Sequence, residues 1–274
     1  MRVQCIFTCY NRKEKSYRCI KSLANGNQNI FFDFIVVDDN STDGTREMLC
    51  ELRQKEGINV RVVKGPGNLY YSQGMRLGMK FALQTQKDYD YLLMVNDDVL
   101  FIEHSIEGMI KESVEKNNAV IVGATKDSNG NLSYSAIKYV TGYRYRQLSI
   151  NEYKVKADTF NANCVLIPYF IFLDCGPLDE KYIHSLGDFD YGLEIRKRGY
   201  DIFVSKDYCG ICNKNPTKNS WLDPNLSIKK RLQLKESVKG APMRQWYYFL
   251  KKNFGIKSAI IGSLTPYIRI ILKR

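Results

Sequence analysis

The order of apolar runs in the first hundred residues most restricts what this chain can fold into. Runs with the length and composition of strands lie at 3–8, 31–37, 59–63 and 89–95, and each is followed by a stretch with helical spacing. Parallel strands need such crossover segments, because the chain must return to the end of the sheet where the previous strand began before it starts the next one. The pattern therefore predicts an α/β fold, a mostly parallel sheet flanked by helices.

The rest of the chain is less regular. A turn-rich region that ends near Asn131 indicates short antiparallel pieces. The further elements we expect are a helix at 103–116, strands at 119–122, 163–167 and 201–204, and a helix at 188–198 closed by Gly199.

Acidic residues follow two of the predicted strands. The second strand ends at Asp38-Asp39, and the fourth ends at Asn96-Asp97-Asp98. Because α/β sheets bind ligands at the carboxyl ends of their strands, we expect these acids to share a crevice. In the turn after Asp39, Ser41 or Thr42 is expected to cap the following helix.

Asp188 and Asp190 begin the helix at 188–198 and are expected at the same crevice. Several carboxylates together need a cation or hydrogen-bond donors, and oxygen ligands suit Mg²⁺ or Mn²⁺. An ion held by few protein groups leaves places for phosphate oxygens, which points to a nucleotide or diphosphate substrate. Two structural alternatives stay open: Asp98 as a helix cap, and the other two as ordinary N-terminal acids.

The positive charge of the chain is concentrated in its last fifty residues. From 226 to 274 there are twelve Lys or Arg and one acid, Glu236, which accounts for +11 of the net +12. Aromatic and aliphatic residues alternate with these cations, as in a helix lying on an anionic membrane. The alternative is a pair of helices that pack on the main domain with solvated lysines. No recognised nucleic-acid motif accompanies the charge, so we expect no nucleic acid.

Other features exclude several classes of protein. The eight cysteines are scattered, and Cys209-Gly-Ile-Cys212 lacks the further ligands of a zinc site. Gly65-Pro66-Gly67 begins a dinucleotide motif whose third glycine is replaced by Tyr70. No apolar run approaches the length of a membrane span, and the first residues lack the apolar core of a signal peptide. We therefore expect a cytoplasmic protein.

Five segments together resemble the inverting family 2 glycosyltransferases over roughly residues 1–215. They are FTCYNR (7–12), VVDDNSTDGT (36–45), GNLYYSQGMRLGM (67–79), YLLMVNDDV (91–99) and GDFDYGLEIRKRGY (187–200). The resemblance implies a GT-A fold, a nucleotide-sugar donor and a divalent ion, Mn²⁺ or Mg²⁺. The chain looks most similar to rhamnosyltransferase-like bacterial members that build surface polysaccharide.

The resemblance also implies which residues bind the donor. Thr8 and Tyr10 match the loop that touches the base and ribose, and Asp39 matches the acid that accepts a hydrogen bond from them. Asp38 either shares that role or caps the turn. A second set is expected to open a helix against the donor phosphates, and it comprises Gly67, Asn68 and Gly74.

The metal motif is represented by Asn96-Asp97-Asp98. Asp98 stands at the main ligand position, Asn96 replaces the first acid of the family pattern, and Asp97 is assigned to the donor site. One charge fewer should weaken metal affinity. The histidine with which the family often completes the metal shell is missing from YCGICN at 208–213, so the third ligand is not identified.

Asp188 aligns with the catalytic aspartate, which takes the proton of the acceptor hydroxyl as that oxygen attacks the sugar. The Glu that usually precedes it is Gly187 here. Three residues are candidates for the acceptor side: Asp190, which alternatively orients the helix start, His184 and Trp221. The aromatic residues after Trp221 are further candidates because sugars stack on aromatic faces, and core packing explains them equally well.

These observations predict a GT-A catalytic domain at 1–215 and a helical, basic, aromatic extension at 216–274. The expected reaction transfers a sugar from a UDP- or dTDP-sugar to a glycan or lipid-linked acceptor, with inversion, at the inner face of the membrane. Residues 226–274 are expected to contact that membrane, and an oligomer is left open. The alternatives are a sugar-nucleotide pyrophosphorylase, whose glycine- and arginine-rich first loop is missing here, and a non-catalytic membrane- or nucleic-acid-binding module.

Overall fold

The computed structural model describes residues 1–85 and 88–272. Within these residues one nine-stranded sheet has the order β3-β2-β1-β4-β11-β6-β12-β5, with β7 beside β6, and a small sheet has the order β10-β8-β9. The strands are β1 (Arg2–Cys9), β2 (Phe31–Asp38), β3 (Val60–Lys64), β4 (Tyr91–Val95), β5 (Leu100–Phe101), β6 (Val120–Lys126), β7 (Leu132–Tyr134), β8 (Ala136–Thr141), β9 (Arg144–Gln147), β10 (Thr159–Phe160), β11 (Cys164–Pro168) and β12 (Ile202–Ile211).

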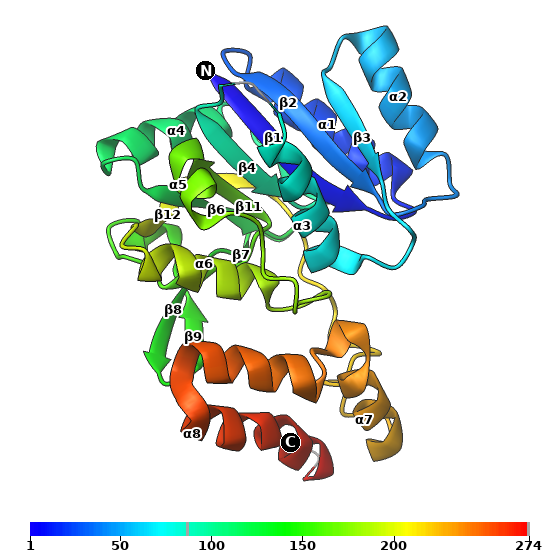
Figure 1. Cartoon of the computed structure of the whole chain (residues 1–274), viewed down its shortest axis with the longest axis vertical. Helices are drawn as coiled ribbons and strands as arrows, with labels where there is room; N and C mark the ends of the chain where they lie inside the picture. Colours follow the sequence, from blue (N-terminus) through cyan, green and yellow to red (C-terminus); the bar gives the residue numbers. More distant parts are fainter. Residues whose placement is uncertain (86–87, 273–274) are drawn as a thin grey trace.

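Helices cover both faces of the large sheet and continue beyond it towards the carboxyl terminus (Figure 1). The α-helices are α1 (Lys13–Gly26), α2 (Thr45–Glu56), α3 (Tyr70–Leu83), α4 (Ser105–Glu115), α5 (Tyr169–Cys175), α6 (Gly187–Lys197), α7 (Ile228–Glu236) and α8 (Met243–Ile271). Two short 3₁₀ turns lie at Ile150–Glu152 and Val238–Gly240.

The predicted parallel half is confirmed. Strands β3, β2, β1 and β4 are all parallel, and α1, α2 and α3 lie in the connections between them. The antiparallel pieces expected at the turn-rich region are also present, since β7 runs antiparallel to β6 across that turn and β8 pairs with β9. The antiparallel pairing of β11 with β4 and β6 was not predicted.

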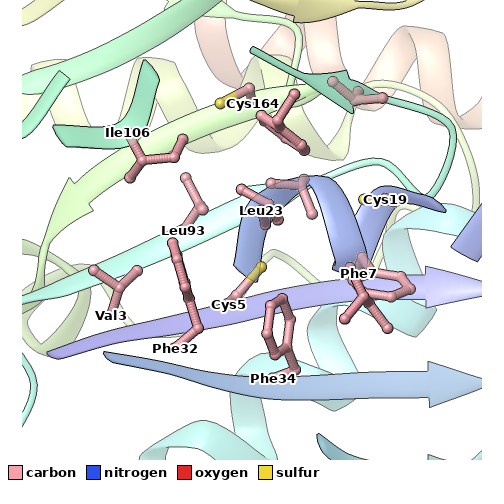
Figure 2. Close-up of a cluster of buried hydrophobic side chains, with 14 of the residues drawn as sticks. Val3, Cys5, Phe7, Cys19, Leu23, Phe32, Phe34, Leu93, Ile106 and Cys164 are labelled. Carbon is pink, nitrogen blue, oxygen red and sulfur yellow. The ribbon is translucent and has the colours of Figure 1, made fainter. Parts of the chain in front are cut away.

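Alternation along the central strands builds two cores, one on each face of the sheet. From β1, Val3, Cys5 and Phe7 point into the first core, where they meet side chains of α1 and α4 (Figure 2). Ile6 points to the opposite face, where it joins Met75 of α3. With both faces buried, the central strands read as nearly continuous apolar runs, which is why the sequence reveals them.

The expected start of α2 was wrong. The helix begins at Thr45, after Gly44 in the left-handed conformation (φ 83°), rather than at a Ser41 or Thr42 cap. The backbone N–H of Ser41 donates to Asp38 Oδ1 (3.1 Å), and that of Thr42 donates to Asn11 Oδ1 (2.7 Å). These bonds hold the turn as a loop, so Asp38 caps the turn, as one of the two interpretations predicted.

The basic extension folds into α7 and α8, and Lys273 and Arg274 lie outside the described residues. Gly255 (φ 82°) breaks α8 into an inner stretch, 243–254, and an outer stretch, 256–272, which fold back on each other (Figure 1). Trp246 Nε1 donates to the carbonyl of Gly262 (3.0 Å) and joins the two. In the described ranges, no helix combines the length and the apolar character that crossing a membrane requires.

Candidate active site

Asp39, Asp98 and Asp188 line one cavity of about 730 Å³, here called the aspartate pocket. Asp39 directly follows β2, Asp98 lies in the turn after β4, and Asp188 lies in the first turn of α6. The pocket is therefore at the carboxyl ends of the parallel strands, where α/β folds bind ligands. Three segments far apart in the sequence meet there, as the acidic clusters predicted.

The carboxylate of Asp39 organises one wall of the pocket. It is buried, and it accepts backbone N–H groups from Gly67 (2.7 Å), Leu69 (2.8 Å) and Tyr70 (3.4 Å). Asp39 thus takes the place of an anion at the start of α3. The expectation that the N–H groups of this turn face donor phosphates is wrong for Gly67, because Asp39 already accepts its hydrogen bond. Asn68 lies beside it and lines the pocket.

Thr8 and Tyr10 also line the pocket, at the end of β1. Thr8 Oγ1 donates to the carbonyl of Val37 (3.2 Å), while the ring of Tyr10 is exposed. Gly74 lies outside the lining residues. A Cβ at that position would approach Thr8 Oγ1 to 2.4 Å, so the glycine lets α3 pack closely on β1 rather than bind a phosphate.

Arg12 bridges the two carboxylates of the Asn96-Asp97-Asp98 turn. Its Nη1 lies 3.0 Å from Asp97 Oδ1 and 2.9 Å from Asp98 Oδ2. Asn96 lines the pocket too, and its backbone N–H donates to the carbonyl of Asn163 (3.1 Å). The turn therefore holds a positive charge between its acids. The next helix, α4, begins at Ser105 after His104, so Asp98 does not cap it and that alternative is wrong.

The chemistry of this turn fits a divalent cation. Asp97 Oδ2 is buried and finds no hydrogen-bond partner in the described part of the chain. Burial, with a smaller contribution from the charge of Asp98, raises the pKa of Asp97 to about 7 despite the opposing effect of Arg12. Among the residues that the structure describes, no group of three His, Cys, Asp or Glu side chains could hold an ion. An ion here would complete its ligand shell with oxygens from water or from a substrate, as Mg²⁺ often does.

Cys212 lies beside the metal turn, just after β12. Its Sγ is 3.6 Å from Asp98 Oδ1, and Asn163 Nδ2 donates to the same sulfur (3.5 Å). Burial and the charge of Asp98 raise the pKa of the thiol to about 12, so it is neutral. The Sγ of Cys209 instead lies against Gly123 in the sheet. The two cysteines of the CGIC motif therefore have different surroundings.

Asp188 is half-buried in the pocket wall. Its Oδ1 accepts the backbone N–H of Phe189 (2.9 Å), and its Oδ2 accepts that of Ala162 (3.3 Å). Burial raises its pKa to about 6, although these hydrogen bonds act in the opposite direction. A Cβ at Gly187 would meet Ser72 Oγ at 2.6 Å, so glycine allows α6 to start against α3.

His184 lines the pocket near Asp188, with its ring edge-on to Tyr70 at 6.0 Å between centroids. Its Nδ1 is buried and lacks a hydrogen-bond partner among the described residues. Burial, with a contribution from Lys239, lowers the pKa of the imidazole to about 4, so the ring is neutral. Because Nδ1 is buried, the ring meets the pocket through its other atoms.

Aromatic side chains close the side of the pocket next to Asp188. We call this set the aromatic wall: Tyr139, Tyr143, Tyr145, Phe189, Trp246 and Phe249. Trp246 stacks on Phe249 (5.7 Å, 15°), and Tyr145 meets Phe189 edge-on (5.2 Å). The wall combines the β8–β9 pair with α6 and the inner stretch of α8.

Two of the three acceptor candidates lie elsewhere. Asp190 is buried outside the lining residues, where it accepts hydrogen bonds from Lys252 Nζ (2.6 Å), Asn253 Nδ2 (2.8 Å) and the Tyr182 hydroxyl (3.1 Å). Trp221 lines a separate cavity next to the outer stretch of α8. Asp190 therefore joins α6 to α8, and Trp221 does not contact the aspartate pocket.

Two groups of pocket residues were not predicted. Arg12 belongs to the FTCYNR segment, and a cation directly after the first strand is the signal that could have paired it with the acids. The tyrosines of the aromatic wall, Tyr139, Tyr143 and Tyr145, gave no comparable signal, because they lie in an irregular region. Trp246 and Phe249 were expected on the acceptor side only as aromatic residues that follow Trp221.

Solved structures similar to this chain include glycosyltransferases. The mannosyltransferase PcManGT of Pyrobaculum calidifontis, in complex with GDP-Man and Mn²⁺, matches with a TM-score of 0.62 at 12% identity, over 99% of this chain and 73% of that one. TarS 1-349 of S. aureus, in complex with UDP-GlcNAc, matches with a TM-score of 0.60 at 16% identity, over 99% and 82%. Fold and pocket together define a protein of the GT-A class.

The chain belongs to glycosyl transferase family 2, whose family model matches residues 5–178. The glycosyltransferase GlyG of Streptococcus pneumoniae serotype 4 is 25% identical over 197 residues, which are 69% of this chain and 62% of GlyG. The chain spans between about half and three fifths of the length of the curated relatives it matches. The family match ends before Asp188, so the role of that residue depends on its geometry.

Proposed function

We propose that this chain transfers a sugar from a nucleoside-diphosphate donor to an acceptor hydroxyl, with inversion, in a single displacement. The observation that carries the proposal is the meeting of Asp39, Asp98 and Asp188 in one pocket. The three carboxylates have different surroundings: one is held by backbone N–H groups, one by a guanidinium, and one by burial with two backbone bonds. Different surroundings suit different roles in one reaction.

The donor half of the pocket is formed by the ends of β1, β2 and β4. We assign the nucleoside to the surface made by Thr8, Tyr10 and the turn that Asp39 holds at Gly67 and Asn68. Each carboxylate oxygen can accept more than one hydrogen bond, so Asp39 can also accept one from the base or ribose of UDP or dTDP. Its first task is to fix the loop that forms this surface.

The diphosphate lies, in this proposal, over the Asn96-Asp97-Asp98 turn. Asp98 and Asp97, with Asn96, would hold Mn²⁺ or Mg²⁺ together with phosphate oxygens. When bound, the ion neutralises the charge that develops on the leaving diphosphate. Arg12 forms ion pairs with these carboxylates when no ion is bound. Once the carboxylates bind an ion, the long Arg12 side chain can turn its guanidinium towards a phosphate.

Asp188 is the proposed base. A carboxylate with a pKa near 6 is ionised at neutral pH, and it can take the acceptor proton as the new carbon–oxygen bond forms. The other carboxylates among the described lining residues are bound by Arg12 or by the 67–70 turn. Since a retaining mechanism through a covalent intermediate needs a second, nucleophilic carboxylate, this arrangement favours inversion.

The acceptor is assigned to the aromatic wall and His184. Sugar rings present C–H groups that pack on aromatic faces, and the neutral ring of His184 lines the same pocket. A glycan or lipid-linked oligosaccharide of a bacterial surface polysaccharide fits this description. On the sequence resemblance, we also propose membership of the rhamnosyltransferase-like branch. On the basic extension, we propose a location at the inner face of the membrane, with membrane contact through 226–274.

A thermal-shift screen of UDP- and dTDP-sugars, with and without Mn²⁺, tests the function. A true donor at about 100 times its Kd should stabilise the fold by about 2.7 kcal/mol, a shift of about 5 °C or more. Asp98→Ala should lose the Mn²⁺-dependent part of the shift, whereas Asp188→Asn should keep it. If no nucleotide sugar raises the unfolding temperature under any of these conditions, the proposal is wrong.

A further inference from the structure

The outer stretch of α8 carries a continuous row of exposed aliphatic side chains. Each of them is between 49% and 65% exposed, and we call the set the apolar stripe: Ile256, Ile260, Ile261, Leu264, Ile268, Ile271 and Leu272. Spacings of mostly three or four residues place them on one side of the helix. Scattered exposed apolar residues are ordinary, but a row of this length on one helix marks a surface that contacts something.

The stripe is not the side that holds α8 in the fold. Ala259, Gly262, Ser263 and Ile270 of the same stretch are buried, and a Cβ at Gly262 would approach Leu250 of the inner stretch to 2.5 Å. One side of the outer stretch therefore packs on the protein, and a second apolar side is left uncovered. A helix with two apolar sides is more hydrophobic than packing on the domain alone requires.

The charges around the stripe are of one sign. Lys257 and Arg269 are exposed on the same stretch, and Lys229 and Lys230 are exposed at the start of α7. The only acid between 226 and 274, Glu236, is hydrogen-bonded by the Tyr267 hydroxyl. Two copies of this face would bring like charges together, which disfavours a dimer through the stripe. An anionic surface would be attracted instead.

A cavity of about 620 Å³ adjoins the stripe. Its lining is mostly apolar, with one cation, and consists of Trp221, Leu222, Thr265, Ile268, Arg269 and Leu272. Tryptophan beside a basic residue is typical of the zone between lipid headgroups and acyl chains. Trp221, which does not reach the aspartate pocket, therefore lies next to the stripe residues Ile268 and Leu272.

We infer that the apolar stripe docks this chain on an anionic lipid bilayer, with the outer stretch of α8 lying in the plane of the interface. The stripe enters the boundary between headgroups and acyl chains, while Lys257 and Arg269 extend to the lipid phosphates. The inference narrows the membrane contact from the whole of 226–274 to one side of one helix. It does not depend on the reaction, so its test uses no substrate.

Co-sedimentation with vesicles tests the inference on the full chain. Vesicles of equal parts phosphatidylcholine and phosphatidylglycerol should bind the protein, and pure phosphatidylcholine vesicles should bind it far less. Raising salt from about 0.1 M to about 0.5 M should release much of it, because screening weakens the lipid attraction. Lys257→Gln with Arg269→Gln should lower the partition constant at least about tenfold, as each cation contributes about fivefold.

The stripe itself is tested with Ile260→Ser, Ile261→Ser and Leu264→Ser combined. This variant should lower the partition constant at least about fiftyfold, because three aliphatic side chains no longer leave water. A matched control on α4, Val114→Ser with Lys111→Gln, also removes exposed apolar area and charge and should bind like the wild type. Thermal unfolding of each variant shows whether the fold is kept.

Two results would overturn the inference. One is a folded stripe variant that binds anionic vesicles as well as the wild type. The other is a wild-type chain that does not bind the anionic vesicles. If that chain also sediments as a dimer while the stripe variant sediments as a monomer, the stripe belongs to a contact with a second copy.

Discussion

At the scale of single residues, Asp188 is under two opposing influences. Burial in the pocket wall raises its pKa to about 6, and backbone N–H groups of Ala162 and Phe189 limit that rise. The same two bonds fix the direction of the carboxylate. A base needs this orientation more than it needs a high pKa, since the acceptor hydroxyl becomes acidic only as it attacks.

The pKa of Asp188 predicts how the rate depends on pH. Because its ordinary value is 3.8 and the folded value is about 6, the ionised base is lost as the pH falls through about 6. Transfer kcat/KM should be flat above about pH 7 and fall about tenfold per unit below about pH 6. Donor binding measured over the same range separates this effect from protonation of Asp97. A kcat/KM that stays constant down to about pH 5 would contradict the assignment.

Arg12 predicts a competition for the metal turn. Its guanidinium has to leave Asp97 and Asp98 before an ion binds there, so Arg12→Gln should strengthen Mn²⁺ binding in the absence of donor. Since the Arg12 side chain is 41% exposed and partly screened, we expect a Kd about three to ten times lower by titration calorimetry. Arg53→Gln, on the surface of α2, is the control. Equal or weaker binding by the Arg12 variant would show that the ion does not replace Arg12.

Site residues could be predicted from the sequence where they lie at the end of a strand or the start of a helix. Asp39 and Asp98 follow strong strand patterns, and Asp188 begins a helix, so their meeting could be predicted. Asp190 was placed near the acceptor only because it lies two residues from Asp188. On a helix, residues two apart point in different directions, and Asp190 faces α8 instead.

At the scale of elements, the contact between α6 and α8 is polar and specific. Lys252 donates to Asp190 (2.6 Å) and to Asp179 (3.0 Å), and the Tyr248 hydroxyl also donates to Asp179 (2.8 Å). The Lys252 ammonium thus binds two carboxylates, one before and one after the 180–186 loop. This network sets the position of the inner stretch of α8 against the helix that carries Asp188.

Removing the cation from this network should be costly. Lys252→Met would leave the Asp190 carboxylate, 3% exposed, without its counter-ion. We expect a loss of about 2–4 kcal/mol in the free energy of unfolding, measured by urea denaturation. Lys251→Met, at the exposed neighbouring position, should change it by less than about 0.5 kcal/mol. If the two variants unfold alike, the network does not hold α8 in place.

Most elements with long apolar patterns were predicted within a few residues, but β12 continues to Ile211, seven residues beyond the predicted strand at 201–204. Short elements were not predicted. Strands β5 and β10 have two residues each, and α5 has seven, which is too few for a periodic signal. The break in α8 depends on Gly255, which the composition of the tail did not distinguish from glycines that continue a helix. Tertiary packing, not local preference, decides these cases.

At the scale of the whole molecule, the carboxyl-terminal extension has two parts with different surroundings. Its inner stretch supplies Trp246 and Phe249 to the pocket, while its outer stretch exposes the apolar stripe. The extension therefore packs against the rest of the chain and helps to form the pocket. The domain boundary at residue 215 stays a prediction. Removing 226–274 would take Trp246 and Phe249 from the pocket as well as removing the stripe.

The central claim is that the pocket binds an activated sugar and that Asp188 deprotonates the acceptor. The most direct test is the rate of sugar transfer by Asp188→Asn at saturating donor, with the donor Kd measured on the same preparation. We predict a fall of at least about 10³ in kcat with a donor Kd within about threefold of the wild type, because the amide keeps the shape but accepts no proton. Transfer within about tenfold of the wild-type rate would contradict the account.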